Sequence, residues 1–163
     1  SYVFRRAVCD APTNSLNKFS PSVIAKLNKV QDEGGNYREA FESYFLLEEG
    51  TARRFPADAE FVQALETRDV YHFRRSFYML SCLENQHHKK DPLPIEPGTY
   101  TIEHIMPQNA LEHEEWRAAL GPDYEEKFEV LVHSLGNLTL TAYNSELSDG
   151  TFEQKKRTCY RWV

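Results

Sequence analysis

The chain has 163 residues, of which 40% are hydrophobic and 13% aromatic, so one or two small domains with a hydrophobic core are expected and a disordered chain is excluded. The net charge of −6 argues against a protein that binds nucleic acid through a general surplus of basic side chains. No apolar run reaches the 18 residues of a membrane span and no signal peptide opens the chain, so we expect no membrane association. The first residue is Ser1 rather than Met, which is compatible with a fragment of a longer polypeptide.

The charge is unevenly distributed along the chain. Residues 1–30 have a basic surplus, residues 31–70 are strongly acidic, and seven acidic side chains lie between residues 112 and 129. Basic residues gather again near the C-terminus, where Lys155 and Lys156 lie in a predicted helix. A basic site near the end of the chain is therefore compatible with the negative net charge of the whole chain.

The three cysteines are far apart and form no C-x-x-C pair, which disfavours a disulfide framework and a zinc ribbon. They are Cys9, Cys82 and Cys159. We expect reduced thiols in a cytoplasmic protein.

The N-terminal half predicts helices. One begins at Ser20 as N-cap with Pro21 in the first turn, and it ends at Gly34-Gly35. Further apolar patterns with helical spacing follow at residues 37–47, after the candidate cap Asp58, and at residues 70–84. The aromatic side chains of these stretches are expected in the core.

A proline-rich stretch follows, and because three prolines in six residues cannot propagate a helix we expect an extended linker at residues 91–99. The neighbouring His87 and His88 are expected on an exposed loop. The domain organisation predicted is therefore a helical region at 1–90, this linker, and a second domain at 100–163.

The second domain changes pattern. Residues 100–105 alternate β-branched or aromatic with polar residues and predict a strand, and residues 137–141 predict a second one. Between them residues 109–134 read as helical, split by Gly121-Pro122. After a turn at Asp149-Gly150, a last helix is predicted at residues 151–160 with Thr151 as cap.

Candidate chemistry lies on these two strands and after them. Glu103 and Asn144 offer oxygen ligands for a hard cation, and a neutral imidazole at His104 is a candidate general base. Glu103 and His104 cannot share one face of a regular strand, so we expect the strand end before Pro107 to relax that alternation. Asn137 is suited to hydrogen-bonding the backbone and fixing the hairpin. The set predicts a metal-dependent phosphodiesterase.

Four motifs in this order resemble the C-terminal HNH (His-Me finger) nuclease domain of the GmrSD-type restriction endonucleases, which are bacterial defence proteins. They are Thr101-Ile102-Glu103-His104-Ile105-Met106-Pro107-Gln108, Leu131-Val132-His133-Ser134-Leu135-Gly136-Asn137-Leu138-Thr139-Leu140, Tyr143-Asn144-Ser145-Glu146-Leu147 and Phe152-Glu153-Gln154-Lys155-Lys156. Residues 1–9 and 55–61 also resemble the helical region that precedes that domain.

The resemblance implies an α+β fold, in which a mainly helical N-terminal half precedes a ββα-metal core with a helical insertion. It implies a DNA endonuclease using Mg²⁺ or Mn²⁺, with His104 as general base, Glu103 and Asn144 as metal ligands, and Asn137 bracing the loop. Lys155 or Lys156 is expected to contact DNA phosphate. Many HNH nucleases carry Asp at the position of Glu103. The implied partner is an N-terminal ParB-like NTPase and DNA-sensing domain, which nothing in this sequence matches.

Two other functions remain open at this stage. The first is a catalytically degenerate module of the same fold that binds DNA or docks onto the NTPase partner. The second is a structural zinc site formed by His104, His133 and a cysteine. The sequence does not indicate the oligomeric state, the DNA modification that is sensed, or whether one strand or both are cut.

Overall fold

The structure, a computed structural model, describes residues 2–12, 16–46 and 54–160, with the side chains of residues 16–20, 45–46, 87, 146 and 158–160 left out of the description. The chain forms two compact units, Ser1–Ala64 and Leu65–Val163. Each unit is described separately below.

The first unit is helical, and a buried arginine organises part of it. Helix α1 spans Tyr2–Val8 and α4 begins at Asp58 and ends at Thr67. Arg6 is fully buried, and its guanidinium donates hydrogen bonds to the carbonyl oxygens of Arg54 and Pro12. Arg5 pairs with Asp58 at the start of α4. Because a buried guanidinium needs acceptors, these backbone carbonyls fix the segments around α1.

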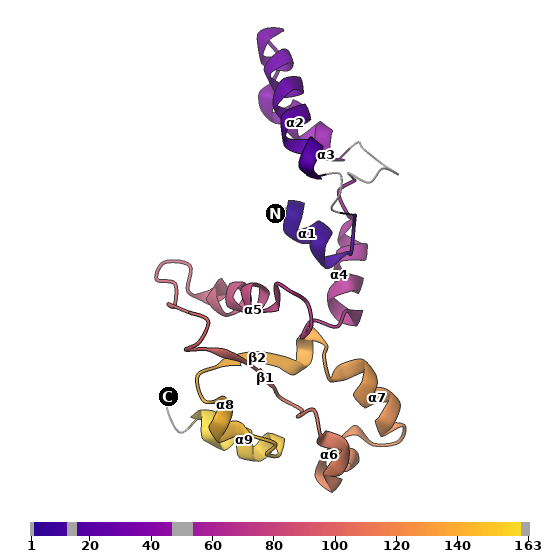
Figure 1. The fold of residues 1–163 in the computed structure, drawn as a ribbon, viewed down its shortest axis with the longest axis vertical. Coiled ribbons are helices and arrows are strands. Elements are labelled where there is room, and N and C mark those ends of the chain that lie inside the picture. Colours follow the sequence, from indigo (N-terminus) through magenta and orange to yellow (C-terminus); the bar gives the residue numbers. More distant parts are fainter. Residues whose placement is uncertain (1, 13–15, 47–53, 161–163) are drawn as a thin grey trace. The chain divides into compact units, whose positions relative to one another are not determined.

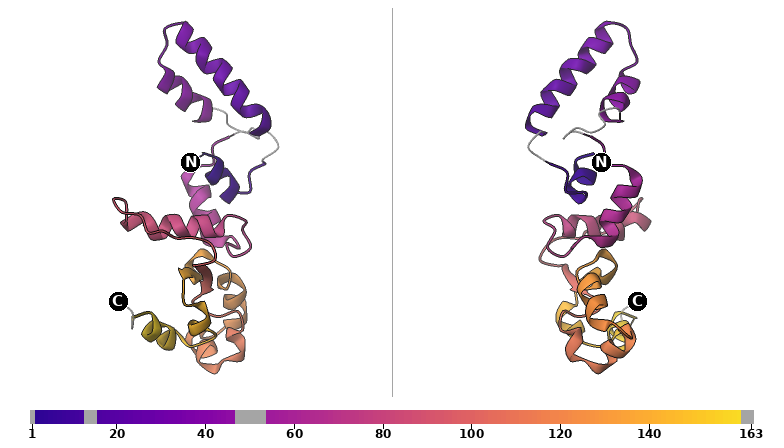
Figure 2. Two further views of the ribbon diagram at one scale, coloured as in Figure 1. Left: turned by 60° about the vertical axis from the view of Figure 1, so that its left-hand side comes forward. Right: turned by 90° about the vertical axis from the view of Figure 1, so that its right-hand side faces the viewer.

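Helices α2 (Leu16–Asp32) and α3 (Tyr37–Leu46) pack side by side as a helical hairpin (Figures 1 and 2). Its contact is small, with Val23, Leu27 and Tyr44 buried. The connection confirms the predicted end of the first helix at Gly34-Gly35. The amide N–H of Gly35 donates to the carbonyl of Val30, and Gly34 has φ +74°. This is a Schellman termination, in which glycine adopts the left-handed conformation without a steric cost.

The predicted start of α2 is wrong. The helix begins at Leu16 and runs through Pro21, which therefore does not lie in the first turn. A proline inside a helix removes one backbone hydrogen bond, and this helix accommodates that loss. Helix α3 is capped by a residue that the sequence reasoning missed. The side-chain oxygen of Asn36 accepts hydrogen bonds from the backbone N–H groups of Arg38 and Glu39.

The second unit is built on two antiparallel strands. Strand β1 (Thr101–His104) pairs with β2 (Leu138–Thr141), with Glu103 opposite Thr139 and His104 opposite Leu138. Among the described residues this is the only sheet. Figure 1 shows it between α5 (Ser76–Glu84) on one side and α8 (Asn144–Leu147) with α9 (Phe152–Tyr160) on the other. Helix α5 contacts β2, and α8 contacts β1.

Helix α5 begins six residues later than the sequence pattern predicts. The backbone N–H groups of Val70 and Tyr71, which a helix starting at Val70 would leave without helical acceptors, donate to the carbonyl of His133. The side chain of Asp69 accepts a hydrogen bond from the backbone N–H of His72 and stabilises a turn there. Residues 71–75 thus form turns and a bend instead of the first turns of the predicted helix, and the segment before them is tied to a residue more than sixty positions away.

The proline-rich stretch forms neither helix nor strand at residues 92–96. It follows a 3₁₀ turn (Asn85–His87), and the side-chain oxygen of Asn85 accepts a hydrogen bond of 2.7 Å from the backbone N–H of Leu93. This hydrogen bond helps to fix the course of the chain before β1.

The insertion between the strands is helical, as predicted, and it has its own small core. A 3₁₀ turn (Ala110–Glu112) leads into α6 (Glu114–Leu120) and α7 (Tyr124–Leu131), and the break falls at Gly121, whose φ is +74°. Buried Met106, Ala110 and Val132 pack against aromatic and aliphatic side chains of both helices. The acidic residues of this region lie on the outside of the insertion because its apolar side chains face this core.

The predicted α+β class is confirmed. The last helix starts directly after its predicted cap, Thr151. The Thr151 hydroxyl accepts a hydrogen bond from the backbone N–H of Gln154, and the Gln154 side chain accepts one from the backbone N–H of Thr151. This reciprocal pair is a capping box. Over the described ranges, no helix has the length and apolar character needed to cross a membrane.

Candidate active site on the two-stranded hairpin

Strand β1 directs its last two residues to opposite faces. Glu103 and His104 are both about 6% exposed, and both lie in the regular register with β2. Because successive side chains of a strand alternate, the two groups face different surroundings. The expected relaxation of the alternation at the strand end is not observed. The hairpin therefore separates the carboxylate from the imidazole.

The carboxylate face contains a buried ion pair. Lys155, on α9, donates hydrogen bonds to Glu103 Oε1 at 2.6 Å and to the carbonyl oxygen of His104 at 2.7 Å. The two side chains are 7% and 8% exposed. This ammonium group thus neutralises Glu103 and holds α9 against the end of β1. Lys155 is not on the surface, whereas its neighbour Lys156 is exposed.

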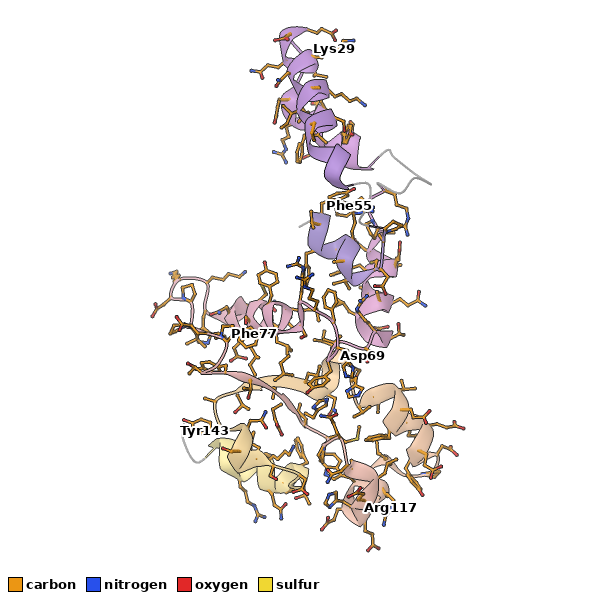
Figure 3. All side chains as sticks on the ribbon, in the orientation of Figure 1. Lys29, Phe55, Asp69, Phe77, Arg117 and Tyr143 are labelled. Carbon is orange, nitrogen blue, oxygen red and sulfur yellow. The ribbon has the colours of Figure 1, made fainter. Side chains whose placement is uncertain are left out.

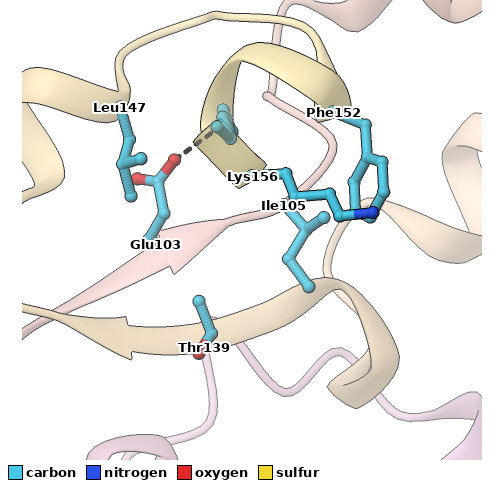
Figure 4. Close-up of a pocket in the computed structure, with 7 residues that line it drawn as sticks. Glu103, Ile105, Thr139, Leu147, Phe152 and Lys156 are labelled. Atoms are coloured by element: carbon cyan, nitrogen blue, oxygen red, sulfur yellow. Dashed lines mark hydrogen bonds and ion pairs between the residues drawn. The ribbon is translucent and has the colours of Figure 1, made fainter. Parts of the chain in front are cut away.

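A pocket of about 440 Å³ opens beside this ion pair (Figure 4). Its lining combines the ion pair with residues that follow β1, lie in β2 or lie in the two C-terminal helices: Glu103, Ile105, Thr139, Leu147, Phe152, Lys155 and Lys156. The carboxylate of Glu103 points toward α9 in this view. The pocket is the one place in the described structure where a predicted metal ligand and both predicted phosphate-binding lysines meet.

Asn144 lies on the same face of β1 as Glu103. Its side-chain Nδ2 donates to the hydroxyl of Thr101 and to the carbonyl of Ile102, both at 3.1 Å. Thr101 and Glu103 are two residues apart in β1 and so point the same way. With Nδ2 used in this way, the amide carbonyl oxygen is the atom of the Asn144 side chain that can bind a cation.

Asn137 braces the loop between β1 and α6, as the sequence predicts. Its Oδ1 accepts a hydrogen bond from the backbone N–H of Met106 at 2.7 Å, and its Nδ2 donates to the carbonyls of Met106 and Val132 at 2.9 and 2.8 Å. The backbone carbonyl of Asn137 also accepts the N–H of Ile105. The residue is 8% exposed. It therefore fixes the backbone that follows His104 without facing a ligand itself.

The imidazole of His104 lies on the opposite face, among other rings. Its Nε2 is 3.2 Å from Nδ1 of His133, and the ring centroid of Tyr71 is 4.4 Å away. Burial lowers the pKa of His104 to about 4, and the nearby His133 and Lys155 contribute to this shift. His104 is consequently neutral at pH 7 and able to accept a proton or a hydrogen bond.

A group of potential metal ligands surrounds these rings, and the sequence reasoning did not find it. Asp69, His72 and His133 each offer a ligand atom, and these atoms lie within 4.8 Å of one another. The signal available in the sequence was the i, i+3 spacing of Asp69 and His72. No described cysteine side chain joins the group, and the side chain of Cys159 lies outside the described residues.

The structure thus brings Glu103, Asn144 and the two lysines to one face of the hairpin, and places His104 on the other. A β-hairpin carrying a carboxylate and an imidazole, with helices on both sides, defines a small α+β domain with a pocket at the strand end. Residues 55–161 match the family described as GmrSD restriction endonucleases, C-terminal domain, and the chain belongs to this family. Searches of curated proteins and of solved structures gave no significant match.

Proposed function

We propose that this protein is a metal-dependent DNA endonuclease domain of the HNH type, which nicks or cleaves foreign DNA within a bacterial restriction and anti-phage system. The observation that carries the proposal is the placement of Glu103 and Asn144 on one face of a two-stranded hairpin, next to a pocket, in a chain of a restriction endonuclease family. The substrate is DNA because the members of this family are described as restriction endonucleases.

The donor atoms on this face fit a hard divalent cation. Lys155 contacts Oε1 of Glu103, which leaves Oε2 for a cation, and the amide oxygen of Asn144 adds a neutral ligand. Mg²⁺ and Mn²⁺ favour such oxygen ligands and keep several positions for water and phosphate. When bound, the ion stabilises negative charge on the phosphate oxygens. Glu103 and Asn144 are the residues that hold it in this proposal.

His104 acts as the base in this proposal. Its low pKa keeps the imidazole neutral, so it accepts the proton of the attacking water at physiological pH. Because the imidazole lies on the face opposite Glu103, the scissile phosphate has to lie across the end of β1 to contact both groups. Asn137 supports this arrangement by fixing the backbone directly after His104.

The two lysines divide the remaining tasks. Lys156 is exposed at the pocket and contacts a DNA phosphate in this proposal. Lys155 is buried and positions Glu103, and its positive charge adds to the attraction for phosphate. An N-terminal ParB-like NTPase and DNA-sensing domain of the same polypeptide or complex, acting with this domain in the cytoplasm, selects the DNA and compensates for the acidic balance of this chain.

A plasmid cleavage assay with Mg²⁺ or Mn²⁺ tests the proposal. The parent protein converts supercoiled plasmid to the nicked or linear form. His104→Ala reduces the cleavage rate at least about 100-fold, as loss of a general base does. Glu103→Gln reduces the rate to a similar extent. His113→Ala is the matched control, because His113 is a partly exposed histidine on the helical insertion. Equal rates for His104→Ala and the parent overturn the assignment.

Calorimetric titration of Mn²⁺ separates the endonuclease from a catalytically degenerate module of the same fold. A degenerate module that binds DNA or docks onto the NTPase domain neither cuts DNA nor binds Mn²⁺ at this site. The proposed endonuclease binds Mn²⁺, and Asn144→Ala weakens that binding.

A further inference from the structure

A second group of metal-ligating side chains lies outside the Glu103 pocket, around the ring of His104. It consists of Asp69, His72 and His133, and Figure 3 labels Asp69 at this position. Asp69 and His72 are exposed and His133 is half-buried, so solvent ions have access to the group. The proposed endonuclease mechanism uses none of these three side chains.

Backbone contacts hold the three residues together. The N–H groups of Val70 and Tyr71 donate to the carbonyl oxygen of His133 at 2.8 and 3.3 Å, and Asp69 Oδ1 accepts the N–H of His72 at 3.0 Å. The segment before α5 and the turn before β2 are thereby fastened to each other at the position of the three side chains. A ligand set drawn from two such segments is preorganised, because binding does not have to bring them together.

The types of ligand select the class of ion. Two imidazoles and one carboxylate suit Zn²⁺ and similar transition metals, whereas Mg²⁺ and Ca²⁺ prefer oxygen ligands only. Tetrahedral Zn²⁺ with bonds of about 2.0–2.1 Å places its ligand atoms about 3.3 Å apart. Atoms within 4.8 Å reach that spacing through small rotations, since Asp69 and His72 are exposed. The ion replaces the proton that Asp69 Oδ2 and His72 Nδ1 share at 2.8 Å.

The neighbouring His104 sets the orientation of His133. The hydrogen bond between Nδ1 of His133 and Nε2 of His104, which are 3.2 Å apart, orients the ring of His133, and Nε2 is the second nitrogen of His133 that can bind an ion. Metal-bound histidines commonly donate their second N–H to such a partner, which fixes the tautomer and the ring.

We propose that Asp69, His72 and His133 bind one transition-metal ion of the zinc class, with His104 as the positioning residue for His133. The fourth position of the ion is open to water, because the described part of the chain supplies three ligands. The site is separate from the Glu103 and Asn144 pair and lies on the other face of β1. It ties the segment before α5 to the turn that precedes β2.

The test measures zinc itself, with no reference to DNA cleavage. The parent protein is loaded with ZnCl₂, dialysed and analysed by inductively coupled plasma mass spectrometry, and it retains about one ion per chain. Isothermal titration then shows that His72→Ala lowers the affinity at least about tenfold, and that His104→Phe lowers it about 10–100-fold through its effect on His133. Co²⁺ substitution gives the visible absorption of a site with histidine and oxygen ligands.

His113 is the matched control. Its Nε2 is 3.5 Å from a carboxylate oxygen of Asp149, and among the described residues it belongs to no cluster of three potential metal ligands. His113→Ala and Glu103→Gln leave zinc binding unchanged. His72 is exposed, so His72→Ala folds, and its circular dichroism spectrum matches that of the parent. Less than about 0.2 zinc ions per parent chain, or equal affinity of His72→Ala and the parent, overturns the proposal and leaves the endonuclease proposal standing.

Discussion

The buried ion pair between Lys155 and Glu103 gives the sharpest test of how this domain is held together. Replacing Lys155 with Met keeps the bulk of the side chain but leaves the Glu103 carboxylate buried without its cation, at a site where both side chains are less than a tenth exposed. Breaking a buried ion pair in this way costs about 3–5 kcal/mol. The carbonyl of His104 also loses a hydrogen bond of 2.7 Å, which adds about 1 kcal/mol.

Urea denaturation followed by circular dichroism measures this loss. With a slope of about 1–3 kcal/mol per molar urea, the midpoint of Lys155→Met falls by more than about 1 M. Lys156→Met is the matched control on the same helix, and because Lys156 is exposed its unfolding free energy changes by less than about 0.5 kcal/mol.

The double variant Lys155→Met/Glu103→Gln completes a thermodynamic cycle. Since it removes both charges together, it is less destabilised than the sum of the two single variants, by about 1–3 kcal/mol. Additive effects, or equal losses for Lys155→Met and Lys156→Met, refute the reasoning that α9 is anchored through a buried ion pair.

Two further changes test the loop brace and the helix end. Asn137→Ala removes three buried hydrogen bonds and leaves backbone groups of Met106 and Val132 without partners. We therefore expect the unfolding free energy to fall by about 3 kcal/mol or more, and Asn137→Asp to restore only part of this loss. An unchanged urea midpoint for Asn137→Ala contradicts the role of the brace. Gly34→Ala places a side chain on a residue with φ +74° and lowers the unfolding free energy by about 1–2 kcal/mol. Gly136→Ala is the control, because its added methyl group meets no atom within 4 Å, and it changes the urea midpoint little. Equal effects of the two changes rule out the left-handed conformation as the cause.

Local signals predicted several elements because they act between near neighbours. Gly34-Gly35 ended a helix, Gly121 split the insertion, and Thr151 capped the last helix. In each case the backbone conformation or a side-chain hydrogen bond within a few residues decides the structure. Some errors were also local, such as the start of α2 and the Asn36 cap, and others arose where distant residues intervene. The turn at Asp69 is one of these, because the backbone N–H groups of Val70 and Tyr71 bond to the carbonyl of His133, more than sixty residues away.

The candidate site divides in the same way. Motif order identified Glu103, His104, Asn137 and Asn144 as polar positions on a hairpin, and the structure places all four on or beside its strands. The sequence did not predict that Lys155 is buried against Glu103. A lysine on an amphipathic helix is usually exposed, and its burial here depends on how α9 packs against β1.

The sequence by itself determined the α+β class, the order of the elements and the family of this chain, because periodicity, capping residues and motif order are written in neighbouring positions. Tertiary structure alone decided which side chains meet. It paired Glu103 with Lys155, turned His104 away from Asn144, and assembled Asp69, His72 and His133. The physical reason is that strand alternation and helix packing bring together residues up to about sixty positions apart, and such contacts follow from the closing of the fold rather than from any local pattern.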